Sequence, residues 1–161
     1  MDQAIAITVN GTAHRIAAPA ETTLLDVLRN QLDLKGSRYG CGLEQCGACM
    51  VLVDGTPVYA CAREIGTLEG HAVTTIEGLG SPAAPHVLQR IFLEEQAGQC
   101  GYCLSGILIS AAALLAANPA PGTAEIAAAL DRHLCRCGAH PRILRAVARA
   151  AAELRQTEAA R

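Results

Sequence analysis

The eight cysteines constrain this chain more than any other feature of its sequence. They fall into two groups of four, and no cysteine is left over. The first group is Cys41, Cys46, Cys49 and Cys61, and the second is Cys100, Cys103, Cys135 and Cys137. This arrangement predicts two separate four-thiol sites.

The N-terminal sequence, the longest apolar run and the net charge indicate the cellular compartment and the kinds of partner to expect. No basic segment followed by an apolar run opens the sequence, so we expect no secretory signal peptide. The longest apolar run, 104–117, is shorter than the roughly 20 residues that a membrane span needs. We therefore expect a cytoplasmic protein without direct membrane insertion, although a partner could carry it to the membrane or export it. The formal net charge of −2 argues against nucleic acid as a partner.

In a reducing compartment, clustered cysteines are metal ligands or redox thiols more often than disulfides. The first group has the Cys-x4-Cys-x2-Cys…Cys spacing of plant-type [2Fe–2S] sites. Glycines interspersed with it allow backbone amides to approach the cluster sulfurs, and these are Gly36, Gly40, Gly42 and Gly47. Zinc is the alternative, although zinc patterns are usually paired Cys-x2-Cys modules.

The second group is less specific on spacing alone. Its Cys-x2-Cys and distant Cys-x-Cys suit either an iron–sulfur cluster or zinc. We expect Cys103 at the start of one helix and Cys135 at the end of another. A thioredoxin-type dithiol is disfavoured, since neither Cys-x2-Cys opens a βαβ unit. No nucleotide-binding glycine loop, nucleophile elbow or acid/base pair stands out, so we expect no catalytic residue on this chain.

Other polar residues lie near the second group. With four cysteines available, we expect His86, His133 and His140 to cap helices or fill interfaces rather than bind metal. The helical spacing of Arg142, Arg145 and Arg149 predicts a basic stripe. A solvated face is the default interpretation of that stripe, and a docking surface is the alternative.

Period-two alternation in the first half predicts a small mixed sheet with one helix. A hairpin over 4–18 turns at Asn10-Gly11, and we expect further strands at 50–53, 56–60 and 73–76. Thr22 or Thr23 caps the expected helix, which carries several leucines.

From about Gly78 the apolar spacing becomes helical, and it predicts four helices. We expect Thr123 to cap the third of them and Pro141 to lie in the first turn of the fourth. The prediction is an α+β chain with a β-grasp ferredoxin-like domain at 1–78 and a four-helix bundle domain at 79–161.

Taken together, the segments 39–55, 99–106 and 134–138 resemble the small iron–sulfur subunit of the molybdenum hydroxylases, the xanthine oxidase family. The resemblance covers residues 4 to about 153. It implies that each group of four cysteines holds one [2Fe–2S] cluster. It also implies a large partner subunit that carries molybdopterin cytosine dinucleotide and hydroxylates the substrate with oxygen from water, with no FAD on this chain.

By the same resemblance, Gln99 and Cys137 lie against the pterin, and electrons pass through the second cluster to the first and then to an acceptor. Residues 135–143 look most like the small subunits of nicotinate dehydrogenase and isoquinoline 1-oxidoreductase. That likeness implies an N-heteroaromatic substrate such as nicotinate and a cytochrome acceptor. The alternatives are an aldehyde oxidoreductase subunit of the same family and, in another class, a free-standing ferredoxin-like or zinc-binding module.

The sequence departs from the family pattern in two places. Glu44 stands where a glycine is usual, and Arg132-His133 stands where Gly-Asn is usual. The first bears on the shape of the cysteine loop, and the second bears on the approach to the second cluster. Neither departure removes an expected ligand.

Overall fold

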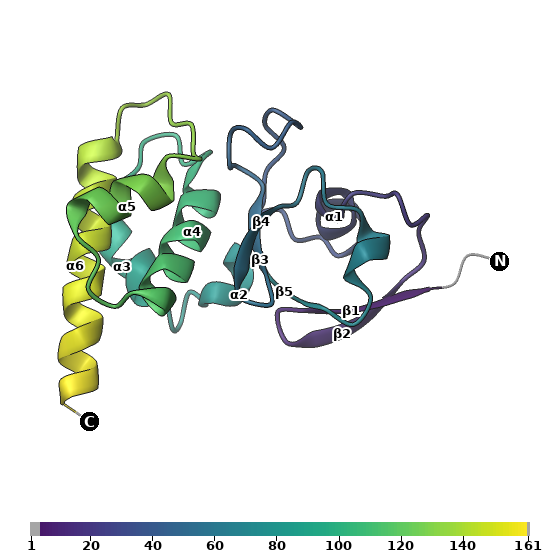
Figure 1. Cartoon of the computed structure of the whole chain (residues 1–161), viewed down its shortest axis with the longest axis horizontal. Coiled ribbons are helices and arrows are strands. Elements are labelled where there is room, and N and C mark those ends of the chain that lie inside the picture. The colour runs from purple at the N-terminus through teal and green to yellow at the C-terminus, as the bar shows by residue number, and fades with distance from the viewer. Residues whose placement is uncertain (1–3, 161) are drawn as a thin grey trace.

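The computed structural model describes residues 4–160, which form a mixed sheet beside a group of helices (Figure 1). The strands are β1 (Ile5–Val9), β2 (Thr12–Ile16), β3 (Met50–Val53), β4 (Thr56–Tyr59) and β5 (Ala72–Thr74). They lie in the order β2-β1-β5-β3-β4, and β1 and β5 pair in parallel. The expected hairpin turns at Asn10 and Gly11, whose φ angles of 49° and 80° are those of a type I′ turn.

The expected first helix is present and covers the sheet. Helix α1 (Leu24–Asp26) continues as a π-helical segment, η1 (Val27–Gln31), which sequence periodicity did not indicate. Of the two candidate caps, Thr23 is the N-cap, and its hydroxyl oxygen accepts the Asp26 amide at 3.3 Å. Buried residues of this helix pack with the inner face of the sheet in one apolar core. A short 3₁₀ helix, η2 (Ile65–Leu68), lies in the connection from β4 to β5.

The second half is helical and has its own apolar core. It contains α2 (Ile76–Leu79), α3 (Val87–Glu94), α4 (Leu104–Ala117), α5 (Thr123–Leu130) and α6 (His140–Ala159). Helix α2 lies across residue 78, and its Ile76 and Leu79 pack against the helical core. The expected Thr123 cap was wrong by one residue. Gly122 is the N-cap, and its amide donates to Oε2 of Glu125 at 2.7 Å.

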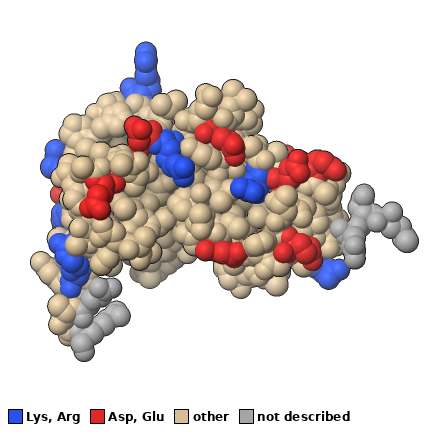
Figure 2. Space-filling view, in the orientation of Figure 1, with Lys and Arg blue, Asp and Glu red and all other residues tan. Residues whose placement is uncertain are grey.

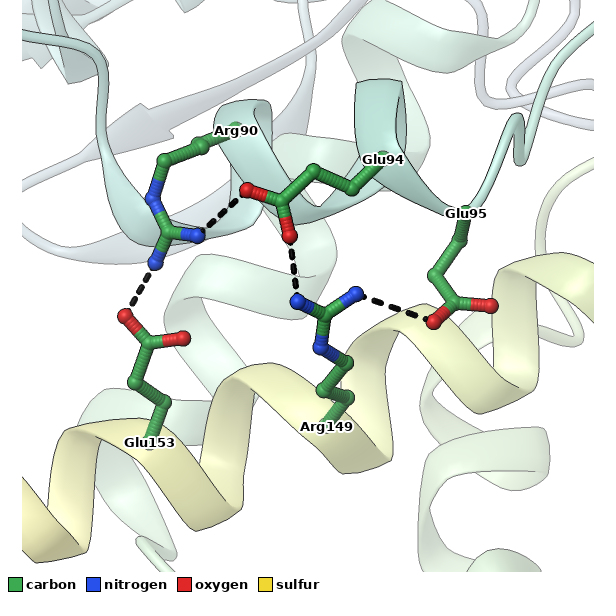
Figure 3. Close-up of polar contacts among 5 residues, drawn as sticks. All are labelled: Arg90, Glu94, Glu95, Arg149 and Glu153. Carbon is green, nitrogen blue, oxygen red and sulfur yellow. Dashed lines mark hydrogen bonds and ion pairs between the residues drawn. The ribbon is translucent and has the colours of Figure 1, made fainter.

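Helix α4 joins the two halves because it packs against β3 and β4 as well as against α5 (Figure 1). Ion pairs connect α3 to α6, where Arg90 and Arg149 lie between three glutamates (Figure 3). On the face seen in Figure 2, basic and acidic side chains are interspersed. Among the described residues, every helix is too short or too polar to cross a membrane.

Candidate metal centres

Three cysteines of the first group lie in the loop before β3, and the fourth, Cys61, lies two residues after the end of β4. The Cys41 sulfur accepts the amides of Leu43 and Gln45, each at 3.3 Å, and the Cys41 amide donates to the Cys46 sulfur at 3.3 Å. The amides of Leu43 and Gln45 lower the pKa of Cys41 to about 7. Thiolate is the form that binds metal, so the loop backbone already favours the ligand state.

The β3–β4 hairpin brings the other two cysteines of this group together. Cys49 and Cys61 are both buried, and their thiols lie beside each other. Burial raises the pKa of Cys49 to about 12, because a thiolate there has lost its hydration. Two adjacent buried thiolates need a cation between them, and iron would supply that charge. This donor set therefore fits a [2Fe–2S] cluster.

The loop shape also suits such a group. Glu44 has a φ angle of 56°, so it adopts the left-handed conformation for which glycine is the usual residue. The departure at Glu44 thus keeps the backbone shape. A side chain on Gly40 would place Cβ 2.6 Å from the Cys46 sulfur, so the backbone there must stay bare.

The second cysteine group lies where two turns meet. Cys103 is the N-cap residue of α4, as expected, whereas Cys135 lies in the turn after α5 rather than at the helix end. The Cys100 thiol lies beside that of Cys137, and the Cys103 thiol lies beside that of Cys135. Burial raises the pKa of Cys103 to about 12. The pairing of these four thiols, of which Cys103 is buried, again fits a four-thiolate cluster.

None of the eight cysteines forms a disulfide. Within residues 4–160, no three His, Cys, Asp or Glu side chains converge as the ligands of a single bound ion do. A [2Fe–2S] cluster instead spreads its four thiolates over two iron atoms.

Direct hydrogen bonds connect the two groups. The Leu134 amide donates to the Cys46 carbonyl at 3.0 Å, which links the residue before Cys135 to a cysteine of the first group. Two further contacts join the Cys100–Cys103 turn to the first loop. They run from Arg38 Nη1 to the Gly101 carbonyl at 2.8 Å, and from the Tyr102 hydroxyl to the Tyr39 carbonyl. Both cysteine-bearing loops accordingly lie on the same side of the molecule (Figure 1).

Gln99 and Cys137 are adjacent, since Nε2 of Gln99 donates to the Cys137 carbonyl at 2.9 Å. An open hollow of about 750 Å³ begins at Gln99 and is lined by apolar residues of α3 and α4 and by Arg142. Leu93 on its rim is 78% exposed. Sequence periodicity could not reveal this hollow, because it forms between elements that are distant in the chain.

Two of the three histidines, His86 and His133, lie where we expected them, at a helix cap and in a buried interface. His86 caps α3, where Nδ1 accepts the Leu88 amide at 3.2 Å. His140 is exposed at the start of α6. His133 is buried, and its Nε2 lies 2.7 Å from the Ser110 hydroxyl. Burial, with a smaller effect of Arg132, lowers the pKa of His133 to about 4, so this imidazole is neutral.

The basic stripe is divided. Arg149 pairs with Glu94 at the end of α3 and with Glu95, the C-cap residue of that helix, whereas Arg142 lines the hollow beside Gln99. Arg145 lies 3.9 Å from Glu95 and is largely exposed. One part of the stripe therefore stabilises helix packing, and another part faces the hollow.

Comparison with known proteins agrees with this geometry. Residues 7–73 match the family model of the 2Fe-2S iron-sulfur cluster binding domain, and residues 75–148 match that of the [2Fe-2S] binding domain. The chain belongs to the family of small iron–sulfur subunits of the molybdenum hydroxylases. The family resemblance and the α+β fold class inferred from the sequence are thereby confirmed.

Two curated relatives match nearly end to end. One is a subunit of nicotinate dehydrogenase from Pseudomonas putida, which is 48% identical over 151 residues, or 94% of this chain and 96% of the relative. The other is the alpha subunit of isoquinoline 1-oxidoreductase from Brevundimonas diminuta, which is 45% identical over 146 residues, or 90% of this chain and 95% of the relative.

A solved structure shows the same fold inside a longer protein. The aldehyde oxidoreductase from Desulfovibrio desulfuricans superimposes with a TM-score of 0.92 at 40% identity. The match covers 96% of this chain but 17% of that one, so this chain spans about a sixth of the aldehyde oxidoreductase.

Proposed function

We propose that this electron-transfer subunit serves a molybdenum hydroxylase that acts on an N-heteroaromatic compound such as nicotinate. The support for this substrate class is the near full-length likeness to subunits of nicotinate dehydrogenase and isoquinoline 1-oxidoreductase. An aldehyde substrate is the second candidate, because an aldehyde oxidoreductase contains the same fold at 40% identity.

The observation that supports an electron-transfer role with two clusters is the pairing of thiols within each group. Cys41, Cys46, Cys49 and Cys61 are the proposed ligands of the first [2Fe–2S] cluster, and Cys100, Cys103, Cys135 and Cys137 are those of the second. Such clusters, when bound, supply one-electron redox chemistry.

The chain contributes positioning and exclusion of water. Cys49, Cys61 and Cys103 are buried, which keeps solvent from one side of each proposed centre. The hydrogen bond from Leu134 to Cys46 holds the two ligand segments in contact. We divide the chain into the proposed domains 1–78 and 79–161 on the strength of the two separate apolar cores, although α2 spans the division.

The partner in this proposal is a large catalytic subunit with molybdopterin cytosine dinucleotide, reached through Gln99 and Cys137. The adjacent hollow, its exposed rim residue Leu93 and the cationic Arg142 support an interface there, because such a surface suits an apolar protein contact beside an anionic cofactor. We further propose that a cytochrome accepts the electrons, that this chain binds no FAD, and that the complex is cytoplasmic.

Metal analysis and EPR of the dithionite-reduced protein, purified with the subunits that bind it, test the proposal. We expect two distinct [2Fe–2S] signals and molybdenum in the complex, with turnover of nicotinate exceeding that of aldehydes. A faster reaction with aldehydes would show that the chain belongs to an aldehyde oxidoreductase, the second candidate. Zinc in place of iron, or a complex without molybdenum, would refute the proposal.

A further inference from the structure

His133 lies between the first cysteine loop and helix α4, in the segment that leads to Cys135. It lies two residues before Cys135, and its ring contacts both the first cysteine loop and α4, the helix that follows Cys103. The side chain is 6% exposed although histidine is polar. Placing an imidazole there costs desolvation, so its contacts must be specific to be favourable.

The first contact is a hydrogen bond within the helical half. Nε2 of His133 lies 2.7 Å from the hydroxyl of Ser110, and Ser110 itself is 4% exposed. A buried hydrogen bond of this length fixes the rotation of the ring against α4. The ring therefore has one defined orientation.

The second contact is with the backbone of the first cysteine loop. A Cβ on Gly47 would lie 2.1 Å from His133 Nδ1, and a Cβ on Gly106 would lie 1.9 Å from the Gly47 carbonyl oxygen. Gly47 has a φ angle of 71°, so glycine also suits its conformation. The loop, the ring and α4 thus touch with no room for a methyl group between them.

The polar atoms of the ring are not fully satisfied. Nδ1 is buried and, among the described residues, makes no hydrogen bond of normal geometry, although it faces the Gly47 backbone. A ring chosen for hydrogen bonding alone would pair both nitrogens. Its place is better explained by the shape of the gap that it fills.

The two residues that flank His133 in the sequence also contact the first half of the molecule. The Arg132 guanidinium lies over the ring of Tyr59, 5.4 Å from its centre, and the Leu134 amide donates to Cys46. Three successive residues of the second half therefore contact the first half, and His133 is the buried one among them.

We infer that His133 is a positioning residue that holds the Cys46–Gly47 backbone against α4 and thereby fixes the placement of the two four-cysteine groups relative to each other. This inference rests on the proposed function, because it assigns the residue a part in the electron relay. The ring acts through the backbone that it contacts and binds no metal itself.

The test uses the purified complex, including the partner, and compares His133→Ala and His133→Gln with His140→Ala. His140 is also close to the second group but is exposed, so it is a matched control. The readouts are iron content, the spin–spin splitting between the two reduced clusters in EPR, the midpoint potential of the first cluster, and deuterium exchange of the peptide that contains Leu134.

We expect His133→Ala to keep the parental iron content while it loses spin–spin splitting, shifts the midpoint potential of the first cluster and exchanges the Leu134 peptide faster. The glutamine variant retains a group that can bond to Ser110, so it should restore these readouts toward the parental values. His140→Ala should match the parent.

Parental exchange and splitting in His133→Ala would overturn the inference. If that variant fails to fold, Ser110→Ala replaces it, because it removes the hydroxyl partner alone. Parental exchange and splitting in Ser110→Ala would then overturn the inference, whereas faster exchange would support it. A parent complex without iron or molybdenum would refute the proposed function instead, so the two failures are distinguishable.

Discussion

The amide of Leu134 donates to the carbonyl of Cys46 across the boundary between the two halves of the molecule, at 3.0 Å. Leu134 directly precedes Cys135, and Cys46 lies in the centre of the first cysteine loop. The bond therefore ties together two segments that both carry proposed ligands.

Replacing Leu134 by proline removes this donor, because proline has no amide hydrogen. We expect a loss of about 1 kcal/mol, or roughly 2–4 °C in Tm for a chain of this size. Leu134→Ala is the control, since the side chain is 66% exposed and the amide is kept. Equal Tm values for the two variants would show that the hydrogen bond contributes nothing measurable.

Gly106→Ala should destabilise the protein although alanine usually favours a helix by about 1 kcal/mol. The added Cβ would lie 1.9 Å from the Gly47 carbonyl oxygen, and a backbone atom cannot rotate away. We expect a net loss of about 1–3 kcal/mol, measured as a lower Tm.

The control for that change is Gly122→Ala, where a Cβ meets nothing nearer than a glutamate oxygen at 3.5 Å. It should lower the Tm less than Gly106→Ala does, because Gly122 has φ −72° and ψ 164°, which alanine adopts, and its hydrogen bond to Glu125 uses the backbone amide, which alanine keeps. A Gly106→Ala protein as stable as this control would contradict the close contact between the cysteine loop and α4.

His86 should make stability depend on pH. Burial lowers its pKa below the ordinary value of 6.5, since the imidazolium loses hydration. Between the pKa of His86 in the folded protein and 6.5, the unfolded chain binds more protons than the folded one. The contribution of His86 to the free energy of unfolding is therefore complete above pH 6.5 and is lost as the pH falls toward the folded pKa. His86→Asn keeps a capping side chain without titrating there. Between pH 8 and pH 5 the Tm of the variant should fall by less than the Tm of the parent. An equal fall in both proteins would show that His86 does not cause the pH dependence.

Arg149→Ala should lower the Tm slightly at low salt. Arg149 joins α3 to α6 through Glu94 and Glu95 (Figure 3). The pairs are exposed, so about 1 M salt should screen them and remove most of the difference. Arg145→Ala is the matched control, because its guanidinium is 3.9 Å from Glu95 and largely exposed. A salt-independent loss would point to packing of the arginine stem instead.

Cys103→Ser should remove the second cluster alone. The Cys103 thiol lies beside that of Cys135, whereas the first group is built from other segments. We expect about half of the iron to remain with an unchanged first EPR signal, because each [2Fe–2S] cluster needs its own four ligands. Turnover with a cytochrome acceptor should stop, and unchanged turnover would contradict the relay.

Much of the fold followed from sequence because local patterns and tertiary structure agree. The alternation in β1, the Asn10-Gly11 turn and the helical spacing from α3 onward each predict the element that forms. The cysteine spacing predicted two groups of four ligands, and the structure places thiols of the same group beside each other, as with Cys49 and Cys61. The assignment of each group to a cluster stays a prediction. The parallel pairing of β1 with β5 was not predictable, because it joins strands that are far apart in sequence. The π-helical turn and η2 escaped detection, since short irregular helices leave no periodic signal.

At the site, too, local features were predictable from the sequence and contacts between distant segments were not. The sequence marked Arg132-His133 as unusual, and spacing placed His133 near the second group. That its ring meets Gly47 and Ser110 depends on how α4 crosses the sheet, which no local pattern encodes. The hollow beside Gln99 arises in the same way, from residues between Gly80 and Arg142.

The bare contact between Gly47 and Gly106 limits how this protein can be recombined. A chimera that takes its first half from one relative and its second half from another must inherit both glycines, or one backbone will collide with a methyl group of the other. The two halves have separate cores, yet at this point the backbone of each half limits which side chains the other can carry. We expect the two halves to be exchangeable with those of a relative when both are taken together, but not when one is taken alone.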